Sequence, residues 1–117
     1  MAISVNEYLS GMVKKVIFSY TALTTGTTSG STSYYYDGEV IRVIASNTKV
    51  ESGVIALKDD DGNDLLMGLG TLTTGVTYFE PTTGGALNLG GISNSKLTLE
   101  HTIYPTTGSG YVYVYIR

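Results

Sequence analysis

The sequence contains no cysteine and no tryptophan among its 117 residues. The absence of cysteine excludes a disulfide framework, a thiolate nucleophile and a zinc-thiolate site. If the protein works outside a cell, its stability therefore comes from packing or from assembly with other chains.

Charge is also scarce. Asp, Glu, Lys and Arg make up 15% of the chain, and the formal net charge is −3. A weakly acidic chain of this kind has no electrostatic attraction for nucleic acid or an anionic membrane, so neither is predicted as a partner. Much of the surface must consist of serine, threonine, glycine and tyrosine.

Long apolar runs and helical periods are missing as well. No apolar run approaches the roughly 20 residues that cross a bilayer, and the first residues, MAISVNEYLSGMVKK, lack the pattern of a secretory signal. No segment keeps a 3.6-residue apolar period over about three turns, so no helix is predicted. The apolar content of 42% is ordinary for a single globular domain.

Short β-type segments are present instead, separated by turns rich in glycine and threonine. They cover residues 12–20, 39–46, 53–69, 76–80, 95–104 and 111–117. We predict an all-β fold, an antiparallel β-sandwich that is jelly-roll-like, with about seven or eight strands. The sandwich is expected to span residues 12–117 as one domain, after a flexible N-terminal arm at residues 1–11. The low-complexity residues 21–33 predict a long loop.

Period-2 alternation identifies the expected core side of three of these strands. The residues that it assigns to the core are Ile41, Val43 and Ala45, then Leu97 and Leu99, and finally Val112, Val114 and Ile116.

An acidic turn lies inside the hairpin predicted at residues 53–69. Asp59, Asp61 and Asn63 occupy alternate positions, like the first oxygen ligands of a calcium loop. An EF-hand loop would continue with glycine at its sixth position and glutamate at its twelfth, where this chain has Asp64 and Gly70. Asp and Asn are also ordinary turn residues, so we predict a turn without a metal, with a weak cation site as the alternative.

The hairpin register follows from the turn. A three-residue loop at 60–62, with Gly62 in the left-handed conformation as a G1 bulge, puts the apolar residues of both limbs on one face. The loop pairs Leu57 with Leu65, Ile55 with Met67, and Lys58 with Asp64.

Catalytic residues are not found. His101 is the only histidine, and between Glu100 and Thr102 on a strand it is interpreted as a surface or cross-strand residue. No serine lies in a Gly-x-Ser-x-Gly elbow, and the glycine-rich stretches lack the Lys-Ser/Thr of a phosphate loop. We therefore predict no enzyme activity and no cofactor.

Tyrosine is unusually frequent, at 10 residues against 2 phenylalanines. Six tyrosines fall in two groups: Tyr34, Tyr35 and Tyr36, and then Tyr111, Tyr113 and Tyr115 at alternate positions of the last strand. Such a row suits contact with a protein, stacking on a sugar, or a plain half-exposed sheet face, and the sequence leaves these three open.

The run EVIRVIASNTKVESGVIALKDDDGNDLL, followed by Gly/Thr turns and a short aromatic strand, resembles small virion structural proteins of tailed bacteriophages. The capsid decoration (cement) proteins are the most similar of these, over about residues 36–104. The resemblance implies a β-sandwich, often a homotrimer, made in the host cytoplasm and bound to the outer capsid surface, where it strengthens contacts between major capsid proteins. The arm would anchor it, with candidate contact residues Ile3, Val5, Tyr8 and Leu9.

Two other classes of function remain as alternatives. A carbohydrate-binding or receptor-binding module would use Tyr111, Tyr113 and Tyr115 as its platform. A tail or baseplate subunit would assemble into rings instead of trimers.

Overall fold

The computed structural model describes residues 3–23, 26–47, 53–66, 70–72, 75–79, 91–103 and 108–117, and every regular element within them is a β-strand. The strands are β1 (Ser4–Tyr8), β2 (Lys14–Leu23), β3 (Gly26–Ser31), β4 (Tyr36–Asn47), β5 (Gly53–Lys58), β6 (Thr71–Leu72), β7 (Gly75–Phe79), β8 (Gly91–Ser95), β9 (Thr98–Ile103) and β10 (Gly108–Ile116). The predicted all-β class is confirmed.

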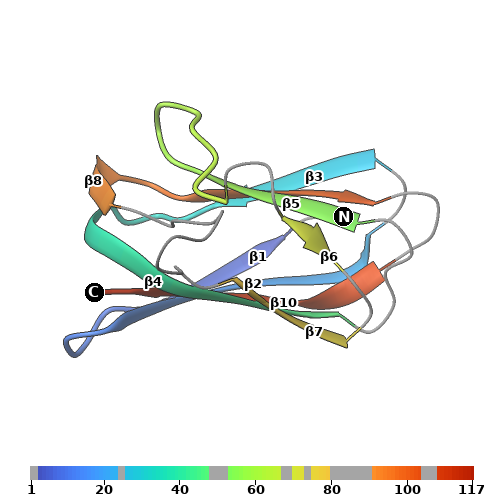
Figure 1. Ribbon diagram of the computed structural model, residues 1–117, viewed down its shortest axis with the longest axis horizontal. Helices are drawn as coiled ribbons and strands as arrows, with labels where there is room; N and C mark the ends of the chain where they lie inside the picture. The colour runs from blue at the N-terminus through green and yellow to red at the C-terminus, as the bar shows by residue number, and fades with distance from the viewer. Residues whose placement is uncertain are drawn as a thin grey trace, which may run out of the picture.

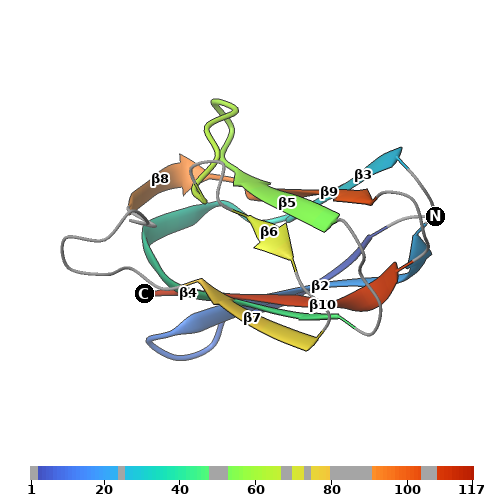
Figure 2. The same cartoon turned by 45° about the vertical axis from the view of Figure 1, so that its right-hand side comes forward.

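Two antiparallel sheets lie face to face as the layers of a sandwich (Figures 1 and 2). The six-stranded sheet has the order β1-β2-β10-β4-β7, with β8 paired to the start of β4, and the four-stranded sheet has the order β3-β9-β5-β6. The order β2-β10-β4-β7 opposite β3-β9-β5-β6 is that of an eight-stranded jelly roll. The predicted sandwich is confirmed, and β1, β3 and β8 are strands that the sequence did not predict.

The N-terminal segment differs from the flexible arm that the sequence predicted. Residues 4–8 form β1, which pairs antiparallel with β2 at the edge of the six-stranded sheet. The Glu7 carboxylate holds this strand against the β3–β4 connection, because it accepts hydrogen bonds from the Tyr36 hydroxyl at 2.7 Å and from the amides of Ser33 and Tyr34 at 3.0 and 3.2 Å. An inward-facing glutamate interrupts the apolar alternation, so the sequence pattern did not indicate a strand.

Glu7→Ala is expected to lower the free energy of unfolding by about 2 kcal/mol, because three hydrogen bonds are lost and the Tyr36 hydroxyl is left buried without its partner. Urea unfolding measures the loss, and faster amide exchange is expected in β1. Glu100→Ala is the matched control, because Glu100 forms a partly exposed ion pair with Lys58 at 3.1 Å, which contributes about 1 kcal/mol or less. Equal losses in the two variants would contradict the role of Glu7.

The long loop predicted at residues 21–33 is largely strand. It contains the end of β2 and all of β3, which pairs with β9. Outward hydroxyls also meet across this pair, with 2.9 Å between Thr27 Oγ1 and Thr102 Oγ1. On the inner side, a Cβ at Gly30 would lie 2.9 Å from the Cβ of Ile3, so the Ile3 side chain fills the space that the glycine leaves. β3 has no large apolar side chain of its own, so Ile3 supplies the apolar contact on its inner side.

The core lies between the two sheets. Leu97, Leu99, Val112, Val114 and Ile116 are all fully buried, as the alternation predicted.

One core assignment was wrong. In β4, Arg42 pairs with Tyr115 but Val40 pairs with Ile116, so Ile41 is the extra residue of a β-bulge. The bulge reverses the alternation, and Val40 faces the core in place of Ile41.

The predicted three-residue loop of the acidic turn is confirmed. Gly62 has a φ of +82°, Lys58 lies opposite Asp64, and the Leu65 amide donates to the Leu57 carbonyl at 2.7 Å. The turn carboxylates accept backbone amides: Asp59 Oδ1 accepts from Asp61 and Asn63, and Asp64 Oδ1 accepts from Leu57 and Leu66.

The two limbs of this hairpin do not stay in the predicted register. The Ile55 amide donates to the Gly70 carbonyl at 2.8 Å, whereas Met67, its predicted partner, lies outside the described residues. Lys58 forms its ion pair with Glu100 on β9. Leu66, next to the Leu65–Leu57 bond, is fully buried.

Candidate functional site

The outer face of the six-stranded sheet carries most of the exposed aromatic side chains of the strands. Strand register arranges its residues in three rows. The first row is Ser4, Ser19, Tyr111, Ser46 and Val76; the second is Asn6, Ile17, Tyr113, Ile44 and Tyr78; the third is Tyr8, Lys15, Tyr115 and Arg42. We call these three rows the tyrosine face. Tyr78 is 65% exposed, and Tyr8 and Tyr111 are about half exposed.

The side chains of the tyrosine face contact one another. The rings of Tyr111 and Tyr113 stack, with 6.0 Å between centroids and 26° between planes. The charged side chains in the three rows are cations that lie over rings: Lys15 Nζ is 5.0 Å from the Tyr8 centroid, and the Arg42 guanidinium is 5.9 Å from that of Tyr115. The face is therefore preordered, aromatic and weakly positive on a chain of net charge −3.

The outer face of the four-stranded sheet has a different composition. Its rows contain threonine and serine, which hydrogen-bond across strands, as in the 2.7 Å contact between Ser31 Oγ and Thr98 Oγ1. Its charges are neutralised in the Lys58–Glu100 ion pair, and Val54 is its exposed apolar residue. The two faces of one sandwich thus differ sharply in apolar content.

The predicted tyrosine groups have different locations. Tyr111, Tyr113 and Tyr115 lie together on the tyrosine face, whereas Tyr34 and Tyr35 are exposed in the β3–β4 connection. Tyr36 is 2% exposed and faces inward, where burial and the hydrogen bond to Glu7 raise the pKa of its hydroxyl. The structure therefore removes Tyr36 from the accessible surface.

The candidate contact residues near the N-terminus also separate. Tyr8 joins the tyrosine face opposite Lys15, and Leu9 is 36% exposed beyond the end of β1. Ile3 is buried in the core, and Val5 is partly buried against it, so both side chains contact the core.

Sequence reasoning missed all four of the other apolar or aromatic residues of the tyrosine face: Ile17, Ile44, Val76 and Tyr78. Their outward positions follow from alternation within each strand. Their gathering on one face with Tyr113 depends on the order β2-β10-β4-β7, which joins strands that are far apart in the sequence.

Of the two interpretations of His101, surface or cross-strand residue, the first is wrong: His101 lies opposite Thr28 and Ile55 on the flanking strands and is fully buried. It points inward like Leu99 on β9 and Leu97 just before that strand. Its ring packs edge-on against Tyr20, with 4.5 Å between centroids, and neither ring nitrogen has a hydrogen-bond partner within the described residues. Because burial disfavours the charged imidazolium, it lowers the pKa of His101 to about 4.

Tyr20, Gly110 and Asn47 are neighbours across β2, β10 and β4. Because Gly110 has no side chain, the Tyr20 hydroxyl reaches across it and donates a hydrogen bond to Asn47 Oδ1. Burial raises the pKa of the Tyr20 hydroxyl, which keeps it protonated as a donor. This buried polar group lies beneath one end of the tyrosine face.

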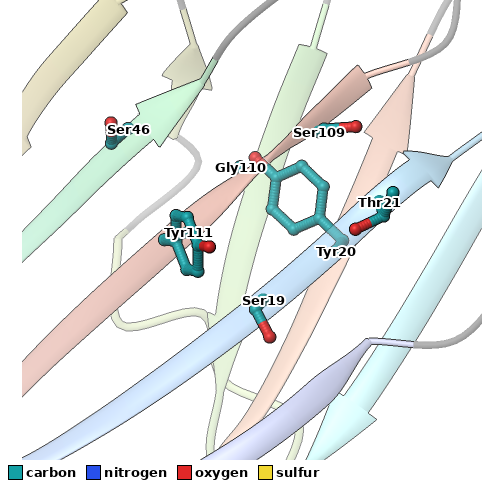
Figure 3. A pocket seen from close by; sticks show the side chains of 7 residues that line it. All are labelled: Ser19, Tyr20, Thr21, Ser46, Ser109, Gly110 and Tyr111. Carbon is teal, nitrogen blue, oxygen red and sulfur yellow. The ribbon is translucent and has the colours of Figure 1, made fainter.

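A pocket of about 320 Å³ opens at that same end (Figure 3). Its lining is Ser19, Tyr20 and Thr21 of β2, Ser46 of β4, and Ser109, Gly110 and Tyr111 of β10. Every lining side chain ends in a hydroxyl group, and none carries a charge.

Neither metal ligation nor a membrane span is indicated. In the part of the chain that the structure describes, His, Asp and Glu form no group of three or more placed to hold a metal ion. The same residues include no helix long and apolar enough to cross a membrane.

Comparison with protein-family models gives no match, and comparison with curated proteins gives none. Among solved structures, one that resembles this chain is a protein of unknown function from Vibrio parahaemolyticus (targeted domain 2–94). The two share 17% sequence identity over 97% of this chain and 98% of that chain, with a TM-score of 0.27. A likeness at this level carries no argument about function.

Proposed function

We propose that the protein is a non-enzymatic capsid decoration protein, which binds the outer surface of a virion capsid and stabilises the shell. The contrast between the two outer faces carries the proposal. One face is aromatic and aliphatic with half-exposed rings, whereas the other presents serine, threonine and a neutralised ion pair. A single extended apolar face with a polar edge is typical of a protein-docking surface.

The second row of the tyrosine face has the chemistry of a docking centre. Ile17, Tyr113, Ile44 and Tyr78 form a continuous apolar line across four strands. Tyrosine provides a large contact area at a small cost in side-chain entropy, since only two torsions are ordered. Lys15 and Arg42 at the third row favour a neutral or acidic partner surface. The partner would be the major capsid protein, and a homotrimer would present three such faces to it.

Stabilisation of the shell would arise by linkage. A protein that binds the assembled shell but not its free subunits adds its binding free energy to the stability of the shell. Three linked faces of one trimer, each of modest affinity, would add avidity.

Two measurements test the role itself. The mass in solution is expected to be that of a trimer, and decorated shells of the virus that encodes the protein are expected to melt at a higher temperature than bare shells. Equal melting temperatures would refute the proposal, as would a stable monomer that binds no shell.

Tyr78→Ala is expected to weaken shell binding about tenfold or more, because truncation of an aromatic anchor in a docking centre typically costs more than about 1 kcal/mol. Binding is measured by cosedimentation with empty shells. Val54→Ala is the control. Val54 is exposed on the opposite face, so its truncation is expected to leave binding unchanged. If Val54→Ala weakens binding and Tyr78→Ala does not, the four-stranded sheet is the docking face instead.

A further inference from the structure

The pocket at the end of the tyrosine face differs from the docking centre in chemistry. Its residues alternate along their strands, so Ser19, Thr21, Ser46, Ser109 and Tyr111 point to the outer side, while Tyr20 and Gly110 lie between them and contribute its base (Figure 3). The first row, where the pocket opens, contains three serines, whereas the second row contains none. The pocket therefore lies at the polar edge of the face.

The lining selects the class of ligand. The described residues that line the pocket include no cation, which disfavours phosphates, nucleotides and carboxylates. The hydroxyl groups on the outward-pointing side chains disfavour a lipid or another apolar ligand. Hydroxyl groups both donate and accept hydrogen bonds, so they match a ligand that is itself polyhydroxylated and neutral.

Tyr111 gives the pocket an aromatic wall. Its neighbours on both sides in the sheet are serines, Ser19 on β2 and Ser46 on β4, so small side chains leave the ring half exposed. The stack with Tyr113 supports the ring. A fixed aromatic ring beside hydroxyl groups accommodates the apolar C–H face and the polar rim of a sugar ring together.

We propose that this pocket binds one pyranose ring of a neutral saccharide. The volume of about 320 Å³ lies at the low end of the range for small-molecule pockets, roughly 300–1,000 Å³, so it admits one ring and not an extended chain. Tyr111 stacks on the ring, and Ser19 and Ser46 exchange hydrogen bonds with its hydroxyls. The site goes beyond shell docking, because it would give the free protein an affinity for glycans through the polar edge of the face.

The test uses the full chain in amide NMR titrations with glucose, galactose, mannose and N-acetylglucosamine, together with a glycan array. Millimolar affinity is expected for at least one neutral sugar, which corresponds to about −4 kcal/mol, with shifts centred on Ser19, Ser46, Gly110 and Tyr111. Absence of binding to every neutral sugar, binding restricted to acidic sugars, or shifts centred elsewhere would overturn the proposal.

Single substitutions distinguish the stacking of a sugar on Tyr111 from loss of the fold and from loss of shell binding. Tyr111→Ala is expected to weaken sugar binding about tenfold or more, Tyr111→Phe to retain most of it, and Ser46→Leu to block the pocket. Tyr78→Ala is expected to keep sugar affinity while losing shell affinity, and unchanged thermal unfolding confirms the fold of each variant. Full sugar affinity in both Tyr111→Ala and Ser46→Leu would refute the site, whatever the outcome for shell binding.

Discussion

Gly110→Ala is expected to lower the free energy of unfolding by about 3 kcal/mol or more, and the melting temperature by roughly 10 °C or more. A Cβ at this position would lie 2.2 Å from the Ser46 carbonyl oxygen and 3.0 Å from both Cα and Oδ1 of Asn47. The closest atom belongs to the backbone of the paired strand β4, so relief of the clash requires β10 and β4 to separate. The new methyl group would also disturb the hydrogen bond that Tyr20 donates to Asn47 across the glycine.

Gly62→Ala is the matched control for this variant. Gly62 has a φ of +82° in the acidic turn, and a Cβ there would meet no atom within 4 Å. The expected loss is therefore backbone strain alone, about 1–2 kcal/mol. Thermal and urea unfolding of both variants measure the difference. Equal losses of stability would contradict the expectation that the close β4 backbone requires a glycine at position 110.

Acidification from pH 6.5 to pH 4 is expected to remove about 3 kcal/mol of stability through His101. Burial holds the pKa of His101 at about 4 in the folded protein, against an ordinary value of 6.5. Between these values the unfolded chain binds a proton that the folded chain excludes, so stability is complete above pH 6.5 and falls as the pH approaches 4. The groups around the imidazole are Thr28 and Ile55 on the flanking strands and the ring of Tyr20, and these offer no anion to stabilise the charged form.

His101→Leu isolates this effect, because His101 is the only histidine of the chain. The variant is expected to lose the part of the pH dependence that His101 causes. It is also expected to be at least as stable as the parent at pH 7, since it removes two buried ring nitrogens that have no partner among the described residues. Urea unfolding at pH 4.5 and pH 7 gives the comparison. NMR titration of the parent His101 supplies a second measurement, and a pKa near 6.5 in the folded protein would contradict the expectation.

Local sequence patterns predicted correctly those features that depend on one strand or one turn alone. Alternation in YVYVYIR separated the buried Val112 and Val114 from Tyr111 and Tyr113, and turn chemistry identified the left-handed Gly62. The same patterns failed for features that depend on contacts with another strand. The bulge at Ile41 depends on pairing with β10, β1 depends on inward hydrogen bonds to Glu7, and β3 is a strand because β9 and Ile3 cover it.

At the candidate site, too, spacing along one strand was informative, whereas contacts between strands could not be predicted. Tyr111, Tyr113 and Tyr115 were recognised from spacing, but Tyr36 has the same residue type and faces the core, because its hydroxyl is bonded to Glu7. His101 follows two leucines in alternation and so shares their burial, although its polarity indicated the surface.

The fold class, the turn at Gly62 and the two-sided character of the last strand follow from the chain alone, because period-2 patterning and glycine conformation act within a few residues. Which strands lie side by side follows from the packed sandwich. The jelly-roll order brings Ile17, Ile44 and Tyr78 into one row with Tyr113, places Tyr111 between Ser19 and Ser46, and packs His101 against Tyr20. Each of these contacts joins residues distant in the chain, and their energies arise only when the whole sandwich closes.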